Sequence, residues 1–125
     1  MLEKISSSSS SELSWHLNLI INKSASLNKL GRYSESIVIL EECLKHKQHE
    51  KLFKNLGDAY FSIGIYEKAN YYYEKAVSID DNYDEAHYNL AVCLFMQENY
   101  HNAKFAILKA LQQSMKNEIY LELQK

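Results

Sequence analysis

The 125-residue chain contains no proline and only three glycines. This composition favours helices and provides few of the residues that tight β-turns require. No apolar run approaches the roughly 18 residues of a membrane span, so membrane insertion is not expected. The formal net charge is −2, which predicts no general attraction to nucleic acid or to an anionic membrane. Hydrophobic residues make up 46% of the chain, enough for one domain with a packed core.

The chain is also poor in chemically reactive patterns. Its two cysteines, Cys43 and Cys93, match no metal-binding or disulfide spacing, which is compatible with a reducing compartment and predicts a cytoplasmic protein. His46 and His49 lie three residues apart, but no carboxylate or cysteine joins them at a ligand spacing, so we interpret them as surface residues. There is no nucleophile–base pair and no phosphate-binding loop. We therefore predict no metal, no cofactor and no enzymatic activity.

The N-terminus is rich in serine. Six serines occupy residues 6–11, after a short segment of mixed charge that lacks the apolar run of a signal peptide. We predict a flexible, solvated tail over residues 1–10 and a single domain over residues 11–125.

The most informative pattern is a repeat with steps of 33 and 34 residues. A turn followed by tyrosine recurs as Gly31-Arg32-Tyr33, Gly64-Ile65-Tyr66 and Glu98-Asn99-Tyr100. Small residues then recur at a matched distance, as Ser36, Ala69 and Ala103. A period of this length indicates a stack of helix hairpins, which forms an extended surface for holding other chains.

Apolar spacing and end signals define the expected helices. They cover residues 11–30, 34–46, 50–63, 67–79, 84–97 and 101–114, with a short last helix from about residue 117. Connections of only a few residues require neighbouring helices to pack antiparallel. We expect repeats over residues 17–49, 50–83 and 84–117, and a C-terminal helix over residues 118–125.

These residues resemble the tetratricopeptide repeat family. The second unit matches its pattern most closely, with Phe53, Leu56, Gly57, Tyr60, Gly64, Tyr66, Ala69, Tyr73 and Ala76. The resemblance implies an all-α fold, a right-handed superhelical stack of antiparallel hairpins with three repeats and a C-terminal capping helix. The chain departs from the pattern at the usual prolines, replaced by Gln48, Asp81 and Met115, and at Lys23, where leucine is expected.

In this family the first helix of each hairpin lines a concave groove that binds peptides. Carried over by position, the expected groove consists of Asn22, Asn55, Asn89, Ile21, Lys51, Lys54, Phe61, Tyr88, Val92, Phe95 and Met96. The three asparagines occupy equivalent places, and an amide both donates and accepts hydrogen bonds. We interpret them as a ladder that contacts the backbone of an extended ligand. Lys51 and Lys54 form a small basic spot that favours an acidic side chain.

One subtype of the family clamps a C-terminal carboxylate of chaperones with two lysines, two asparagines and an arginine. At those places this chain has Ile21, Ala25, Asn55, Glu85 and Asn89, so only one of the five matches and a standard clamp is not expected. We predict a protein-interaction module that binds an extended peptide or helix of a partner protein. The alternative is a self-assembling scaffold, or a secretion-type chaperone, that forms homo-oligomers through the C-terminal helix.

Overall fold

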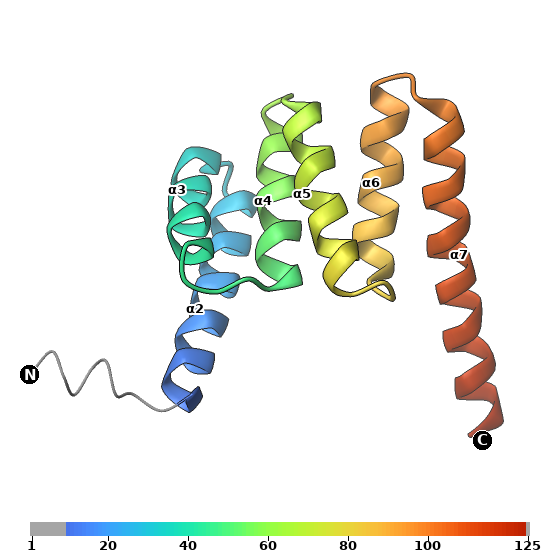
Figure 1. The fold of residues 1–125 in the computed structure, drawn as a ribbon, viewed down its shortest axis with the longest axis horizontal. Coiled ribbons are helices and arrows are strands. Elements are labelled where there is room, and N and C mark those ends of the chain that lie inside the picture. Colours follow the sequence, from blue (N-terminus) through green and yellow to red (C-terminus); the bar gives the residue numbers. More distant parts are fainter. Residues whose placement is uncertain (1–9, 125) are drawn as a thin grey trace, which may run out of the picture.

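The structure is a computed structural model that describes residues 10–124. Within these residues, six helices form three successive antiparallel hairpins, arranged in a row along the long axis of the molecule (Figure 1). The helices are α2 (Ser10–Lys29), α3 (Tyr33–Leu44), α4 (Glu50–Ser62), α5 (Tyr66–Ile79), α6 (Asp84–Met96) and α7 (Tyr100–Leu123). No strand occurs among residues 10–124. The all-α hairpin stack expected from the repeat is thus confirmed.

The expected N-terminal tail lies almost entirely outside the described residues. Ser10, its last residue, already belongs to α2. None of the helices in the described part of the chain is long and apolar enough to cross a membrane.

The turn inside each hairpin occupies the same place in the repeat. Gly31 and Gly64 adopt positive φ angles of 78° and 86°, a backbone conformation that glycine reaches without steric cost. In the third hairpin Glu98 adopts the same left-handed conformation, with φ 62°. The turn geometry is therefore retained where the sequence has lost its glycine.

The hydrophobic core runs through successive hairpins and is densest around α4. Fully buried side chains include Leu40 from α3, Leu52 and Leu56 from α4, and Tyr73 from α5. Each helix of the middle hairpin packs against the hairpin on one side or the other, because α3 contacts α4 and α5 contacts α6. The middle hairpin thus buries its apolar residues on both sides, as stacking requires.

Gly57 allows the two helices of the middle hairpin to approach closely. A Cβ atom built on Gly57 would lie 2.7 Å from Cε1 of Tyr73, much nearer than van der Waals contact permits. The Tyr73 ring therefore occupies the space that a side chain at position 57 would need. This contact explains why position 57 requires a residue without a side chain.

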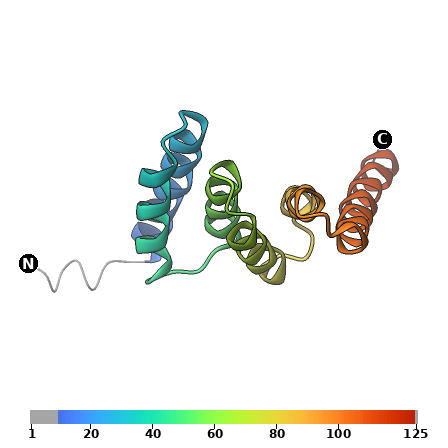
Figure 2. The ribbon, with the colours of Figure 1, turned by 90° about the horizontal axis from the view of Figure 1, so that it is seen from above.

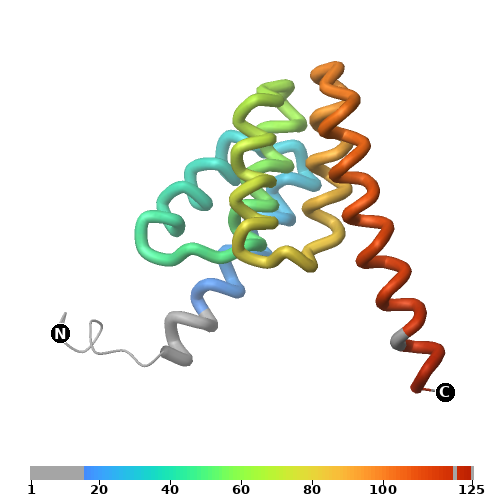
Figure 3. Tube along the Cα trace, turned by 45° about the vertical axis from the view of Figure 1, so that its right-hand side comes forward, coloured from blue at the N-terminus to red at the C-terminus, as the bar shows by residue number. Residues whose placement is uncertain are grey.

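The C-terminus differs from the expectation. The short helix predicted from about residue 117 is not separate, because α7 continues from Tyr100 to Leu123 without a break. Neither proline nor glycine occurs between residues 100 and 123, so nothing in the sequence stops the helix after residue 114. Its C-terminal part runs past the N-terminal end of α6, to which it is antiparallel (Figure 3).

Candidate protein-binding surface

The first helices of the three hairpins form a continuous wall. Helix α2 contacts α4, and α4 contacts α6, although each pair is separated in sequence by a second helix. Seen from above, the three hairpins follow one another, and each is rotated relative to the one before it (Figure 2). We call the surface of α2, α4 and α6 that carries Asn22, Lys51 and Met96 the inner wall.

The three asparagines lie on consecutive first helices but in different surroundings. Asn22 is exposed on α2, Asn89 is half-buried on α6, and Asn55 is only 6% exposed. The Asn55 amide nitrogen donates to the carbonyl oxygen of Ile21 at 3.1 Å and to Oγ of Ser24 at 3.0 Å. Both of its N–H groups are thus used within the fold. The expectation of a three-step ladder open to a ligand is wrong at Asn55, which instead joins α4 to α2.

Asn89 has a comparable role in the following hairpin. Its amide nitrogen donates to Oδ1 of Asp58 at 3.0 Å, which joins α6 to α4. The same carboxylate oxygen accepts a hydrogen bond from the hydroxyl of Tyr73. Burial, followed by the nearby Asp58 carboxylate, raises the pKa of the Tyr73 phenol well above its usual value, so the hydroxyl remains a donor.

The expected basic spot is largely neutralised. Nζ of Lys54 lies 2.8 Å from Asp58 and 2.7 Å from Glu85, while Lys51 remains exposed. Burial alone would lower the pKa of Lys54, but the two carboxylates more than compensate and raise it above its usual value. Lys54 is therefore committed to the junction between α4 and α6, and Lys51 is the cation that the inner wall presents on α4.

Met96 is the exposed apolar residue of the inner wall on α6, and Val92 lies between this wall and the cavity beside α7. They follow Glu85 and Asn89 at steps of three and four residues, and both of these polar residues reach side chains of α4. The Met96 side chain is half exposed and Val92 is half-buried. Ile21 on α2 and Phe61 on α4 are half-buried. The Phe61 ring packs against Tyr66, with 5.3 Å between the ring centroids.

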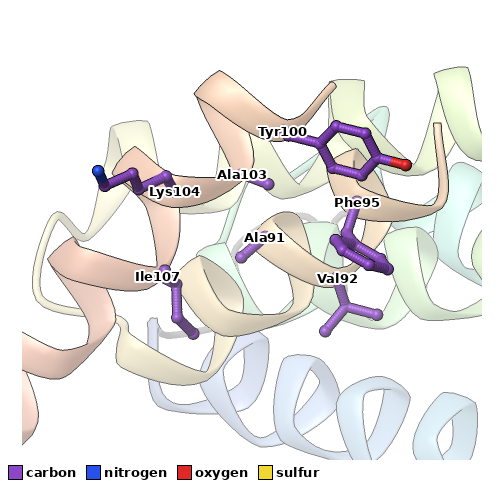
Figure 4. Close-up of a pocket in the computed structure, with 7 residues that line it drawn as sticks. All are labelled: Ala91, Val92, Phe95, Tyr100, Ala103, Lys104 and Ile107. Carbon is purple, nitrogen blue, oxygen red and sulfur yellow. The ribbon is translucent and has the colours of Figure 1, made fainter. Parts of the chain in front are cut away.

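Tyr88 and Phe95 belong to another surface. They lie between the inner wall and α7, where they line two open cavities of about 330 and 420 Å³. In the larger cavity Phe95 meets Tyr100 edge to face, and the rest of the lining consists of Ala91, Val92, Ala103, Lys104 and Ile107 (Figure 4). The expected groove residues thus divide between the inner wall and this end face, which we define as the outer surface of α6 and α7 at the C-terminal end of the stack.

Sequence reasoning missed the importance of Asp58. Its carboxylate contacts three side chains, those of Lys54, Tyr73 and Asn89. One signal was available, because an acid at position 58 lies four residues from Lys54 on a helical face. The contributions of Tyr73 and Asn89 come from other helices and could not be read from that spacing.

The reactive side chains have structural surroundings. His87 is buried, with Nε2 2.9 Å from the carbonyl oxygen of Asp81. The buried Cys93 donates to the carbonyl oxygen of Tyr66 at 3.3 Å, and burial raises the pKa of its thiol to about 11. Such a thiol carries little of the thiolate form that reacts at neutral pH. No group of three or more potential metal ligands comes together among the residues that the structure describes.

Comparison with protein families agrees with this architecture. A model described as TPR repeat matches residues 57–98, and one described as Tetratricopeptide repeat matches residues 84–114. Residues 57–114 are therefore tetratricopeptide repeats, and proteins with such repeats are generally interaction modules rather than enzymes. No curated protein matches the sequence.

Solved structures of this fold are similar in shape but distant in sequence. The second TPR of Spaghetti (RPAP3) bound to an HSP90 peptide is 20% identical, with a TM-score of 0.72 over 75% of this chain and 88% of that chain. PcrH in complex with the chaperone-binding region of PopB is 19% identical, with a TM-score of 0.75 over 81% and 82%. The Sgt2 TPR domain from Aspergillus fumigatus is 23% identical, with a TM-score of 0.73 over 78% of this chain and 65% of that domain. At these identities the likeness establishes the fold alone.

Proposed function

We propose that the protein is an interaction module that binds an extended peptide or a helix of a partner protein along its inner wall. The observation that carries the proposal is the exposed apolar side chain of Met96, next to Val92, on a wall whose other exposed side chains include the polar Asn22 and Lys51. Methionine adapts to ligands of different shape, and the exposed Asn22 amide on α2 can donate to and accept from a peptide backbone. Two of the similar structures, those of RPAP3 and PcrH, contain a bound peptide or partner segment, which supports the same mode of use.

The polar groups of the wall define the ligand further. Asn22 and Lys51 are exposed, and Asn89 is half-buried beside Val92. Asn55 contributes indirectly, because its hydrogen bonds to Ile21 and Ser24 fix the distance between α2 and α4. We expect a ligand with an apolar residue opposite Met96 and an acidic residue opposite Lys51.

A C-terminal carboxylate is not the expected ligand. The clamp that would hold one needs cations where this chain has Ile21, Glu85 and Asn89. Glu85 is an acid on α6 that would repel a carboxylate near it. The ligand is therefore expected to bind through an internal segment.

The test uses peptides selected from a displayed library of random sequences against the whole chain. Isothermal titration of selected peptides is then repeated with Met96→Glu and with Val38→Glu. Both side chains are exposed and both changes add one negative charge, but Val38 lies on α3, away from the inner wall. We expect Met96→Glu to weaken binding about tenfold or more and Val38→Glu to leave it unchanged.

Equal affinities for wild type and Met96→Glu would contradict the proposal, as would a loss of binding on Val38→Glu alone. Helical circular dichroism of both variants controls for folding. The cytoplasmic location expected from the cysteines stays a prediction, which fractionation of cells that express the chain would test.

A further inference from the structure

The C-terminal surfaces of the middle repeat and the last repeat provide an internal comparison. The outer surface of α4 and α5 is covered by α6, with Asn89 on Asp58 and Cys93 on the Tyr66 carbonyl. The corresponding surface of the last repeat is the end face, and α7 packs on α6 alone among the described helices. The end face thus has the position of a junction surface but carries no described helix of its own chain.

The end face is also more apolar than the equivalent surface of the middle repeat, which is formed by α4 and α5 and covered by α6. One step of 34 residues places Val92 where the middle repeat has Asp58, and Ile107 where it has Tyr73. The same step places Lys104 where the middle repeat has Asn70. The helix that would complement this surface therefore needs apolar contacts and one acid, rather than the asparagine of α6.

Helix α7 carries a stripe that meets these requirements. Lys104, Leu108, Leu111, Met115 and Glu118 follow at alternating steps of four and three residues, the spacing of a helix-pairing seam. The three apolar members are 47%, 52% and 61% exposed. Neither Lys104 nor Glu118 forms an ion pair with another residue that the structure describes. The stripe is thus basic at one end, apolar in the middle and acidic at the other.

Such a stripe is complementary to itself when two copies run antiparallel. Lys104 lies seven residues before Leu111, and Glu118 lies seven residues after it. A twofold axis at Leu111 therefore places each Lys104 opposite the second copy's Glu118, and Leu108 near Met115. A parallel arrangement would instead bring like charges together.

The antiparallel direction also agrees with the fold itself. Each helix in the stack runs opposite to the one that follows it, so the helix that would cover α7 in a longer stack is antiparallel to α7 (Figure 1). A second copy of α7 would occupy that position. It would cover the cavities lined by Tyr88, Phe95 and Ile107, and the same contact would cover the equivalent cavities of the second copy.

We infer that the protein forms a homodimer in which two α7 helices pack antiparallel through the stripe from Lys104 to Glu118. The two stacks join end to end, which leaves the parts of both inner walls on α2 and α4 open. This inference does not depend on peptide binding, because the stripe and the inner wall lie on different helices.

The first test exploits the self-complementary charges. Sedimentation velocity is measured over a dilution series for wild type, Lys104→Glu, Glu118→Lys and an equal mixture of the two variants. Wild type is expected to approach twice the chain mass of 14.6 kDa and to dissociate on dilution. Each variant alone places like charges opposite each other twice and should raise the dissociation constant about tenfold. The mixture restores both opposite-charge pairs and should recover the wild-type constant.

The matched control is Lys116→Glu, which makes the same change of charge on the same helix but outside the stripe. It should leave the dissociation constant unchanged. Circular dichroism of every variant confirms that helix content is retained.

The second test reports the register directly. In a Cys43→Ser background, Leu111→Cys is expected to form a disulfide-linked dimer under mild oxidation, because the two copies of residue 111 meet at the axis. Val38→Cys, exposed on α3, should cross-link far more slowly. A wild type that stays monomeric at every concentration would overturn the inference, and so would a mixture that behaves like its separate components. Equal cross-linking at residues 38 and 111 would also overturn it.

Discussion

At the first junction of the stack, α2 and α4 are joined by uncharged groups, whereas at the second, α4 and α6 are joined by a charged network. At the first, Asn55 donates to Ser24 and to the Ile21 carbonyl. At the second, Asn89 occupies the place equivalent to Asn55 but donates to Asp58. The same amide position therefore joins two hairpins in both cases, with different acceptors.

The difference in hydrogen-bond acceptors follows from two positions of the repeat at which the first and second repeats carry different residues. The first repeat has Ser24 where the second has Gly57, and Leu40 where the second has Tyr73. Serine supplies the hydroxyl that Asn55 uses. Glycine supplies none, but it makes room for Tyr73, whose own hydroxyl donates to Asp58. Ser24 is thus combined with Leu40, and the smaller Gly57 with the larger Tyr73. In both pairs the space is filled, and one of the two side chains supplies a hydroxyl for hydrogen bonding.

Among the substitutions that test this difference between the junctions, Gly57→Ala is expected to have the largest effect on stability. The added Cβ would lie 2.7 Å from the Tyr73 ring, so the ring must move and its hydrogen bond to Asp58 is strained. We expect the free energy of unfolding to fall by about 2 kcal/mol, measured by urea denaturation, although alanine is the better helix former by about 1 kcal/mol.

A double-mutant cycle tests the cause of that loss. Tyr73→Leu copies the smaller residue that the first repeat has at the equivalent position, Leu40. Combined with Gly57→Ala, it should cost clearly less than the sum of the two single changes, because leucine leaves room for the methyl group. Additive losses would show that the contact between positions 57 and 73 is not what the glycine serves.

Asn55 and its equivalent Asn22 are expected to differ in how much each contributes to the free energy of unfolding. Asn55→Ala leaves the Ser24 hydroxyl and the Ile21 carbonyl without this donor in a buried setting, and should lower the free energy of unfolding by about 1–2 kcal/mol. Asn22 is exposed on the first helix of the stack, so Asn22→Ala should cost less than about 0.5 kcal/mol. Both are measured by thermal unfolding at one protein concentration. Similar losses at the two positions would contradict a role of Asn55 in joining the hairpins.

Much of the fold could be predicted because repeat spacing is a local property. The period placed the three turns where the structure has them, at Gly31, Gly64 and Glu98. The end of α7 was not predicted correctly, because a break was expected after residue 114 although Met115 stands where the family usually has proline. Methionine allows a helix to continue, so the stop signal was missing.

The candidate site was less predictable because it depends on how hairpins rotate against one another. Asn22, Asn55 and Asn89 are equivalent in sequence, yet only Asn22 is exposed, since the other two each face a preceding first helix. Likewise Tyr88 was assigned to the groove, but it lines a cavity with α7. Whether a side chain faces a ligand or a neighbouring helix is decided by contacts between distant segments, and spacing along one helix does not contain them.

The smallest expected effect concerns the turns, where the third hairpin departs from the first two. Glu98 adopts a left-handed conformation with φ 62°, whereas Gly31 and Gly64 occupy the equivalent places. Because a side chain is strained in this region, Glu98→Gly should raise the free energy of unfolding by about 0.5–1 kcal/mol, after the greater freedom of glycine in the unfolded chain is subtracted. The matched reverse change, Gly64→Ala, should lower it by a similar amount, since its φ is 86° and no neighbouring atom lies within 4 Å of the added Cβ. Thermal unfolding of both variants measures the pair, and a destabilised Glu98→Gly would mean that the glutamate side chain itself supports the third turn.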